Sequence, residues 1–562
     1  MLPSVLPIGT GRQRHERPFA TLTPERGGID FESATRRRMR TDPSRPAFHV
    51  RQDAGAPWHI RSTPVALGSE KSGKKVYRAM PPRWINERHL SSALEQLVAA
   101  SGDFSTELFA RGYIFCDRRP IAPAWWVEDE FVGFRLKHDP RLNTTRKESG
   151  GVAILCLGII FDTRNPKQSQ IATVDGLVAA LDASEGQFLR ELGHTGGRYV
   201  VIYRRAGGPA QLLTDATGMR CALYYHQEAK IVASHAGLAQ LNGEKATPPA
   251  NPISGKFGLP GLKTTLQNVH ILTPNTKLPL NTFKPVRYWP TFPLAELRTE
   301  EAADLFGITL KNSFEWLSSQ FTTVSSLTGG MDSRVTLAIA KHRTTYFTYY
   351  RGDSADTDAT DLAFAQQAAN ELGLSHTVLD GGLKAPQDFR AVQKINAIYQ
   401  HLPNMVYKYK LLFQGDSPIH IRSNLSEIGR MFYKYQKVYP RSASTLMRLW
   451  TTDEALRNDA NVLAFDEFAE RTQFFDAPVE RTSLFYWEHR MGCWHSQVAT
   501  EGDPAFESVS LYNCRRTLEL MLSVPAEAQK SSEILRRTIV NEWPALANYP
   551  VNGKPFVLPS SE

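Results

Sequence analysis

The residues best suited to chemistry form one continuous run, Ser326-Leu327-Thr328-Gly329-Gly330-Met331-Asp332-Ser333. An apolar segment leads into two glycines, and the periodic apolar pattern of residues 335–340 follows. This order predicts a strand, a tight loop and a helix. Glycines let backbone N–H groups approach an anion, and a helix N-terminus attracts one. We therefore expect residues 326–333 to bind phosphate, with Thr328 and Ser333 as hydroxyl donors and Asp332 as a ligand of phosphate-bound Mg²⁺.

The order of residue types in this run is close to Ser-Gly-Gly-x-Asp-Ser. It resembles the pyrophosphate loop of the ATP pyrophosphatases, which split ATP into AMP and pyrophosphate. It is not a Walker A loop, because no Gly-Lys-Ser/Thr follows the required spacer. Thr328 replaces the usual serine and keeps its hydroxyl, and Arg334 is expected either to meet phosphate or to face solvent. An ordinary βα turn with glycines is the alternative reading.

Two further stretches carry a second resemblance, Thr214-Asp215-Ala216-Thr217-Gly218-Met219-Arg220-Cys221-Ala222-Leu223-Tyr224-Tyr225 and Val232-Ala233-Ser234-His235-Ala236-Gly237-Leu238. They are similar to the strand and turn that close the N-terminal domain of asparagine synthetases. Residues 269–275 and 288–290 match landmarks of that family's linker, with Asn275 in place of glycine. The resemblance covers roughly residues 105–562.

The N-terminal domain of that family is a glutamine amidohydrolase with a cysteine nucleophile at its exposed start. This sequence has Leu2, and its first cysteine is Cys116, which only cleavage after Phe115 would expose. We therefore expect the domain to be inactive, as in β-lactam synthetase and the lasso-peptide cyclases that resemble asparagine synthetase. The five cysteines form no CxxC pair and no zinc-ligand spacing.

Residues 419–433 fall where the family carries an acidic Gly-x-Gly-x-Asp-Glu motif. Glu427 coincides with the glutamate, and the resemblance implies that it positions or deprotonates the incoming amine. Ser426 replaces the aspartate that helps to hold Mg²⁺, so Arg422 or Arg430 is expected to compensate for the lost contact. The alternative for Glu427 is a surface ion pair with Arg430.

Other candidates follow from the expected sheet and from the chain's end. Thr348 and Tyr349, on a predicted strand at 345–350, would border the adenine of ATP. Asp358 and Asp361 would either cap a helix or do chemistry. Residues 530–537 resemble the family's terminal helix, where a lysine and a Leu-Arg pair precede a lysine-containing loop. Lys554 falls in that loop and could neutralise charge on phosphate and acyl oxygen; the alternative is a solvated tail lysine.

The fold class expected is a two-domain protein, α/β and α+β. Residues 1–104 would be a partly disordered extension with a short helix at 91–101, and residues 251–295 a linker. Residues 105–250 would form an Ntn-hydrolase-like β-sandwich domain, with the apolar run 152–161 as a strand buried on both faces. Residues 296–562 would form a doubly wound parallel sheet, similar to the adenine nucleotide α-hydrolases, with added helices. Residues 439–545 read as mainly helical, and Leu305, Phe306, Leu310 and Leu317 as one face of a helix.

Composition is ordinary for a folded protein of 562 residues, at 41% hydrophobic and 22% charged, with a net charge of +9. The basic stretches at residues 12–17 and 36–40 read as a solvated tail rather than a nucleic-acid-binding arm. No secretory signal is evident, and the run 152–161 is too short to span a bilayer. We expect a cytoplasmic protein without nucleic-acid or membrane partners.

The function predicted is ATP-dependent amide-bond formation through an acyl-adenylate, with AMP and pyrophosphate released and ATP and Mg²⁺ as cofactors. The substrate would be a small molecule or a peptide that carries a carboxylate and an amine, and a precursor peptide is an expected partner. Three alternatives stay open: an ammonia-using asparagine synthetase, a tRNA sulfurtransferase (disfavoured by the missing cysteine pairs) and a non-catalytic scaffold. The sequence indicates neither the substrate nor the oligomeric state.

Overall fold

The structure, a computed structural model, describes residues 92–249, 258–351, 356–415 and 417–558. Leu2, the basic stretches and the rest of residues 1–91 lie outside these ranges, so the expectations about them are not tested. The first described helix, α1 (Ser92–Ala100), matches the helix predicted at 91–101 and is followed by η2 (Gly102–Glu107).

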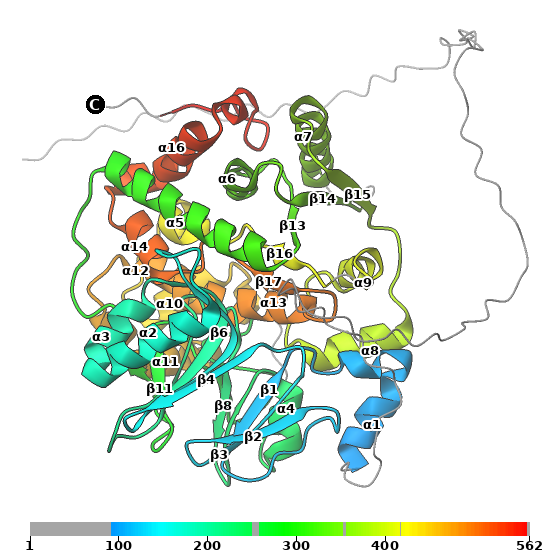
Figure 1. The fold of residues 1–562 in the computed structure, drawn as a ribbon, viewed down its shortest axis with the longest axis vertical. Coiled ribbons are helices and arrows are strands. Elements are labelled where there is room, and N and C mark those ends of the chain that lie inside the picture. The colour runs from blue at the N-terminus through cyan, green and yellow to red at the C-terminus, as the bar shows by residue number, and fades with distance from the viewer. Residues whose placement is uncertain (1–91, 250–257, 352–355, 416, 559–562) are drawn as a thin grey trace, which may run out of the picture. The chain divides into compact units, whose positions relative to one another are not determined.

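The first half of the described chain contains two six-stranded antiparallel sheets (Figure 1). The first sheet has the order β10-β8-β9-β1-β3-β2 and the second has the order β12-β11-β7-β6-β5-β4. The first sheet's strands are β1 (Tyr113–Cys116), β2 (Val127–Phe131), β3 (Phe134–His138), β8 (Leu223–His226), β9 (Lys230–Ala233) and β10 (Val269–Ile271). The second sheet's strands are β4 (Thr144–Ser149), β5 (Val152–Asp162), β6 (Thr195–Arg204), β7 (Gln211–Thr214), β11 (Thr276–Pro279) and β12 (Val286–Arg287).

The two sheets form a sandwich whose outer faces are covered by helices. Residues of both sheets share one buried apolar cluster, which includes Phe115 and Leu155. The second sheet's outer face packs on α2 (Gln170–Ala183) and α3 (Glu185–Leu192), and the first sheet packs on α1 and α4 (Ala236–Asn242). The β-sandwich expected from the sequence is therefore confirmed.

Strand β5 explains why a continuous apolar run was the right signal. Leu155 and Leu157 face the opposing sheet, whereas Ile154 and Cys156 face α2 and α3. Every residue of β5 is buried, because both faces of its sheet are covered. The stretch expected to be a linker, residues 251–295, supplies β10, β11 and β12 to the two sheets.

The second half is built on a five-stranded sheet with the order β15-β14-β13-β16-β17 (Figure 1). Its strands are β13 (Thr323–Ser326), β14 (Thr345–Tyr350), β15 (His376–Asp380), β16 (Ile419–Ile421) and β17 (Glu507–Val509). All four pairings are parallel, as expected for a doubly wound sheet. β17 lies in the region expected to be mainly helical and was missed, because three residues are too few to show a periodic pattern.

The connections of this sheet reverse their direction beside β13. α6 (Met331–Ala340) and α7 (Asp356–Leu372) lead from β13 to β14 and β15, and α8 (Gln387–Asn396) and α9 (Pro403–Leu412) lead back to β16. The strand order therefore reverses between β13 and β16. In parallel sheets, ligands bind at the carboxyl ends of the strands at such a reversal.

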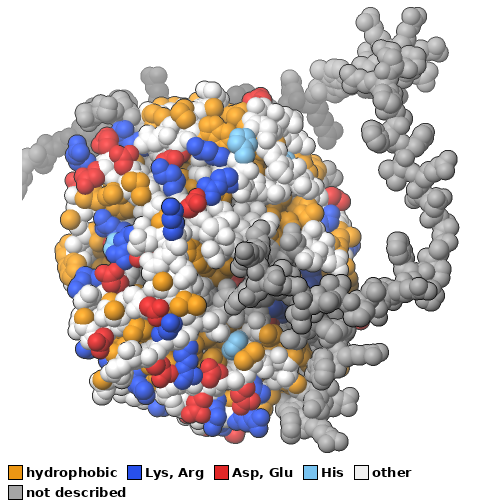
Figure 2. All heavy atoms as spheres, in the orientation of Figure 1, with side chains coloured by type: hydrophobic (Ala, Val, Ile, Leu, Met, Phe, Trp, Pro, Cys, Tyr) orange, Lys and Arg blue, Asp and Glu red, His pale blue; other side chains and the backbone are white. Residues whose placement is uncertain are grey.

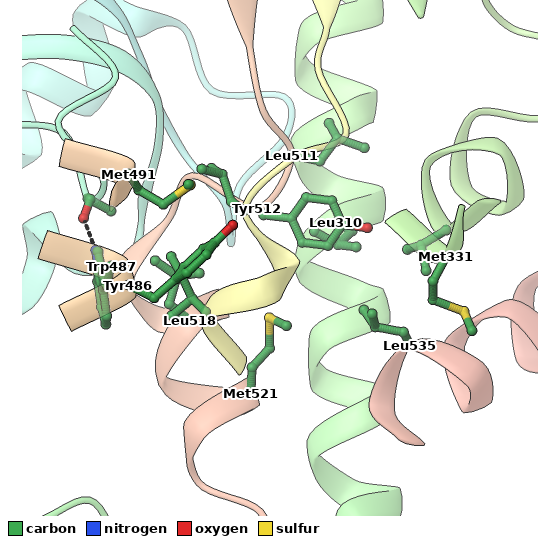
Figure 3. Packing of buried hydrophobic residues seen from close by; sticks show 14 of the residues in the cluster. Leu310, Met331, Tyr486, Trp487, Met491, Leu511, Tyr512, Leu518, Met521 and Leu535 are labelled. Atoms are coloured by element: carbon green, nitrogen blue, oxygen red, sulfur yellow. Dashed lines mark hydrogen bonds between the residues drawn. The ribbon is translucent and has the colours of Figure 1, made fainter. Parts of the chain in front are cut away.

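α5 (Thr299–Gln320) enters this half and packs on its core. Phe306, Leu310 and Leu317 are buried as predicted, but Leu305 is 38% exposed, because neighbouring positions on a helix point about 100° apart. Figure 3 shows Leu310, Met331 and Leu535, from α5, α6 and α16, in one apolar cluster with Tyr512. The packing of Met331 fixes where α6 begins, and with it the loop that precedes α6.

The remaining elements are mostly helical and contribute to the same core. They are η3 (Ser426–Arg430), η4 (Phe432–Tyr435), α10 (Ala443–Trp450), η5 (Glu454–Leu456), α11 (Asp459–Thr472), η6 (Phe474–Asp476), α12 (Arg481–Phe485), the π-helix η7 (Tyr486–His495), α13 (Ser496–Gly502), α14 (Arg515–Leu522), α15 (Ala526–Ser531), α16 (Glu533–Glu542) and η8 (Pro544–Asn548). In Figure 3, Trp487 of η7 donates to the carbonyl oxygen of Ala216 at 2.6 Å, which links this half to the sandwich.

The surface offers two plain observations. On the face drawn in Figure 2, acidic and basic side chains of the described residues are interspersed rather than gathered by sign. Within the described ranges, no helix combines the length and the apolar character needed to cross a membrane.

Candidate active site

The loop after β13 is anchored at its start by the sheet. Leu327 is fully buried; its N–H donates to the carbonyl of Phe347 at 2.8 Å, and its own carbonyl accepts from the Thr348 hydroxyl at 2.6 Å. Since its amide is already used, Leu327 cannot donate to phosphate, contrary to the expectation for this residue. Ser326, half-buried at the end of β13, positions the loop.

Inside the loop, the hydroxyls hold the backbone. The Thr328 and Ser333 oxygens lie 2.8 Å apart, and Ser333 also donates to the Thr328 carbonyl at 2.9 Å. Among the described residues, no side chain forms a capping hydrogen bond at Gly330, the residue before α6. The N–H groups in the first turn of a helix have no intrahelical acceptor. The loop therefore presents backbone donors at a helix N-terminus, while Met331's side chain serves the core.

The glycines are needed for close approach. The N–H of Gly329 donates to Asp361 Oδ1 at 2.7 Å, and a Cβ on Gly329 would lie 3.3 Å from the same oxygen. Asp361 lies in the second turn of α7, so it reaches the loop rather than capping its own helix. Burial, with the nearby Asp358, raises the pKa of Asp361. Asp358 itself forms a two-point ion pair with Arg351 at 2.7 and 2.8 Å.

Asp332 is the electrostatic centre of the site. Its Oδ2 accepts from Arg430 Nη1 at 3.2 Å, whereas its Oδ1 is buried and has no hydrogen-bond partner in the described part of the chain. Burial and the neighbouring Glu427 carboxylate raise the pKa of Asp332 to about 7, although Arg430 opposes them. Glu427 Oε2 is likewise buried without a partner among the described residues.

These two bare oxygens bear on the expected Mg²⁺. Among the described residues, no group of three or more His, Cys, Asp or Glu side chains is arranged to hold a metal ion. Mg²⁺, however, commonly binds through one or two carboxylates together with the phosphates of its nucleotide. Asp332 and Glu427 fit that mode, because each keeps an oxygen for which the described chain provides no donor.

Of the two arginines expected near Asp332, the structure brings only Arg430 there. Arg430 also lies 3.4 Å from Ser426 Oγ and donates through Nε to Ser532 at 3.1 Å. Glu427 and Arg430, both within the described ranges, form no ion pair with each other, so the surface-pair alternative for Glu427 is not what the structure contains. Arg422 instead donates to Asn424 and His495.

Arg334 overturns both expectations for it. It is fully buried, and it donates to the carbonyls of Tyr549 at 2.6 Å and Pro550 at 2.7 Å. Its guanidinium also lies 4.5 Å from the ring centre of Phe364. Arg334 therefore ties the C-terminal segment to α6 and faces neither phosphate nor solvent.

That tie brings the C-terminal turn to the loop. The N–H of Asn552 donates to the carbonyl of Gly329 at 3.0 Å, and Val551 and Lys554 pair across the turn. The side chain of Lys554 is exposed. The structure thus brings the predicted turn next to the loop, and the role of Lys554 stays a prediction.

Arg536 of α16 is a residue that the sequence reading did not single out. Its Nη1 is buried without a partner in the described chain, and its guanidinium lies 5.3 Å from the ring centre of Phe556. Burial and the nearby Arg430 lower its pKa. The available signal was the Leu-Arg pair in residues 530–537.

The expected adenine-bordering residues behave differently. Thr348 is buried, and its hydroxyl is spent on Leu327 and lies 2.9 Å from His376 Nε2. Tyr349 is half-buried at the end of β14, with the guanidinium of Arg351 5.4 Å from its ring centre. Of the two, Tyr349 therefore offers a ring at the edge of the sheet.

Comparisons with known proteins leave the family open. No family model and no curated protein matches the chain. Glutamine phosphoribosylpyrophosphate amidotransferase from B. subtilis, in complex with ADP and GMP, aligns with 53% of this chain and 65% of its own, at 11% identity and a TM-score of 0.21. The chain thus spans less than two thirds of that enzyme. NMN synthetase from Francisella tularensis aligns with 37% of this chain and 97% of its own, at 15% identity and a TM-score of 0.18. Scores this low support no conclusion, so the resemblance to asparagine synthetases stays a prediction.

Proposed function

We propose that this chain is an ATP-dependent amide-forming ligase that works through an acyl-adenylate. The observation that carries the proposal is the pair of bare carboxylate oxygens, Asp332 Oδ1 and Glu427 Oε2, beside the uncapped N-terminus of α6. Buried oxygens without donors are costly, and they are explained when a cation and a phosphate complete the site.

The residues divide the first half-reaction between them. The N–H groups of the first turn of α6, starting at Met331, and the guanidinium of Arg536 bind the β- and γ-phosphates, while Tyr349 borders the adenine. A carboxylate oxygen of the substrate attacks the α-phosphorus, and the bond to the bridging oxygen of pyrophosphate breaks. Mg²⁺ would be held by Asp332 and would supply charge neutralisation at the phosphates.

In the second half-reaction, an amine nitrogen attacks the acyl carbon and AMP leaves with the bonding electron pair. Glu427 takes the proton that the nitrogen loses, because its Oε2 has no competing donor among the described residues. Lys554 offers positive charge from the adjoining turn. The substrate is a small molecule or peptide with both a carboxylate and an amine, for which a precursor peptide is the proposed partner.

The amine comes from the substrate or from free ammonia rather than from glutamine. All five cysteines are buried. Cys116, the last residue of β1, pairs with β3 and β9, and burial raises the pKa of its thiol. A buried thiol with a raised pKa is a poor nucleophile, which supports an inactive amidotransferase-like domain.

The deciding experiment is ATP–pyrophosphate exchange with a panel of amino acids, dicarboxylic acids and peptides, beside AMP formation. Wild-type protein should exchange with at least one acid, and Asp332→Ala should abolish the exchange. Asp466→Ala, at an exposed position of α11, is the matched control and should leave it unchanged. Exchange by the Asp332 variant at the wild-type rate would move the site elsewhere, and no AMP formation with any acid would favour the scaffold alternative.

A further inference from the structure

Arg422 lies where the parallel sheet reverses its strand order. It directly follows β16, and β16 is the strand that lies between β13 and β17 (Figure 1). Its N–H donates to the carbonyl of Val509 at 2.8 Å, and the preceding Ile421 pairs with Ser325 of β13. The backbone of Arg422 is therefore fixed at the carboxyl edge, one residue beyond the strand that adjoins the phosphate loop.

The Arg422 guanidinium is held from one side only. Its Nε donates to Asn424 Oδ1 at 2.9 Å and to His495 Nε2 at 3.1 Å. His495 is fully buried at the end of the π-helix η7, and burial with the Arg422 charge lowers its pKa, which keeps the ring neutral and able to accept. π-Helical turns are rare and occur frequently at functional sites.

The other side of the guanidinium is left open. Its Nη1 and Nη2 donate to no group in the described chain, and no carboxylate of the described residues forms an ion pair with it. Glu501 is the carboxylate that raises the pKa of Arg422, and its oxygens accept from the N–H groups of His401 and Leu402 at 3.0 to 3.2 Å. Arg422 is half-buried, and a half-buried cation without a paired anion gains from a ligand that supplies one.

Two tyrosines lie near the Arg422 guanidinium. Tyr349, the proposed adenine neighbour, and Tyr409 of α9 are both close enough to raise the pKa of Arg422 against the effect of burial. The two Nη groups of Arg422 are thus not used by any group in the described part of the chain.

We propose that the guanidinium of Arg422 is an oxyanion subsite, separate from the pyrophosphate loop, which binds two oxygens of the acyl-adenylate's precursors. The fork of an arginine matches a carboxylate or a phosphate at two points. Two sources share this chemistry: the α-phosphate of ATP and a carboxylate of the acid substrate. The inference rests on the proposed function. It gives Arg422 a role in binding, although Arg422 belongs neither to the phosphate loop nor to the proposed Mg²⁺ site.

The test compares binding of defined probes to wild type, Arg422→Gln, Arg422→Lys and the exposed control Arg448→Gln, by calorimetry. AMP and adenosine report the phosphate, and succinate added to AMP-saturated protein reports the carboxylate. If the phosphate is the ligand, Arg422→Gln weakens AMP binding roughly 10- to 100-fold and leaves adenosine unchanged. If the carboxylate is the ligand, the AMP affinity is unchanged and succinate binding is lost. In either case Arg422→Lys, which keeps the charge without the fork, restores only part of the affinity.

Stability separates a binding role from a structural one. Because the two Nη groups of Arg422 have no partner in the described chain, Arg422→Gln should unfold at the wild-type temperature or above it. If Arg422 instead held the fold together, the same substitution would lower the unfolding temperature. Equal affinities of Arg422→Gln and wild type for all three probes overturn the subsite alone. A wild-type protein that binds neither AMP nor adenosine overturns the proposed function together with the subsite.

Discussion

Buried charges occur in two regions of this molecule, and the two regions treat them differently. Between the sandwich and the parallel-sheet half, Arg198 meets Asp503 at two points, 2.5 and 2.9 Å, and its Nε donates to the carbonyl of Met219. Arg220 pairs with Glu507 in the same region, although its Nε is buried without a partner among the described residues. At the carboxyl edge of the parallel sheet, Asp332, Glu427 and Arg536 each keep a buried atom without a partner within the described chain.

The difference separates structure from function. A charge buried in a joint must be paired, because desolvation costs several kcal/mol for each ion. Asp215 shows the same logic, since it accepts from the N–H groups of Thr217, Met219 and Arg220 and from Asn513. The carboxylates at the joint are thus all paired within the described chain, whereas Asp332 and Glu427 at the sheet edge each keep a bare oxygen, which is the contrast on which the proposed ligand site rests.

The largest expected effect is that of Asp503→Ala, which tests whether the paired charges stabilise the joint. It leaves Arg198 buried and unpaired, so we expect a loss of about 3–5 kcal/mol in the free energy of unfolding. Chemical denaturation followed by fluorescence measures it. The double variant Arg198→Met with Asp503→Leu should recover much of the loss, and Asp466→Ala should stay within about 0.5 kcal/mol of wild type. A mild effect of Asp503→Ala would mean that the joint does not depend on its pairs.

The next largest effect is expected on chemistry at the sheet edge. Glu427→Gln should retain pyrophosphate exchange and slow amide formation by roughly 10²- to 10⁴-fold, because the first half-reaction needs no base at the acyl carbon. Gln keeps the volume and one acceptor, so the fold should be unaffected. Exchange and product yield are measured on one preparation. Loss of both activities together would instead assign Glu427 to the metal, and loss of neither would leave it without a role.

A third prediction uses pH at Asp332. Its pKa is raised from 3.8 to about 7 in the folded protein, so the folded state holds a proton that the unfolded state has released. The free energy of unfolding should therefore fall as pH rises from about 4 to 7 through this group. Asp332→Asn should remove that part of the slope.

At pH 8 the Asp332→Asn variant should thus be at least as stable as wild type, although it cannot support adenylation. Thermal unfolding at pH 5 and pH 8 measures both ends of the window. Glu501, whose pKa burial also raises to about 7, contributes to both proteins, so only the difference between them reports Asp332. An unchanged slope in the variant would contradict the assignment.

Whether a feature could be predicted from the sequence depended on how far apart in the chain its interacting residues lie. β5 and the strand–loop–helix at 323–340 were predictable, because each is encoded in local periodicity and turn residues. β17 was not, since its three residues become a strand only by pairing with β16.

The candidate site divides in the same way. The phosphate loop and Glu427 were predicted from motifs, and their roles stay predictions, whereas the ion pair of Arg430 with Asp332 joins residues far apart in the chain. Arg334 read as a phosphate or solvent residue because nothing local shows that the carbonyls of Tyr549 and Pro550 lie beside it. Side-chain direction at this edge is set by tertiary contacts that no periodic pattern encodes.

The smallest effect expected concerns Asp361, which shares features with both the paired carboxylates and those that keep a bare oxygen. Its carboxylate is paired, but with a loop N–H that a phosphate would also need. Asp361→Asn keeps an acceptor for Gly329 and removes a negative charge close to the incoming pyrophosphate. We expect ATP to bind roughly 3- to 10-fold more tightly, with a gain that shrinks at high salt because charge repulsion is screened. Calorimetry with and without Mg²⁺ measures this, and Asp466→Asn is the matched control. Weaker ATP binding that occurs only in the presence of Mg²⁺ would identify Asp361 as a metal ligand, like Asp332. An affinity that does not change in either series would place Asp361 with Asp215, as a carboxylate that only holds its loop.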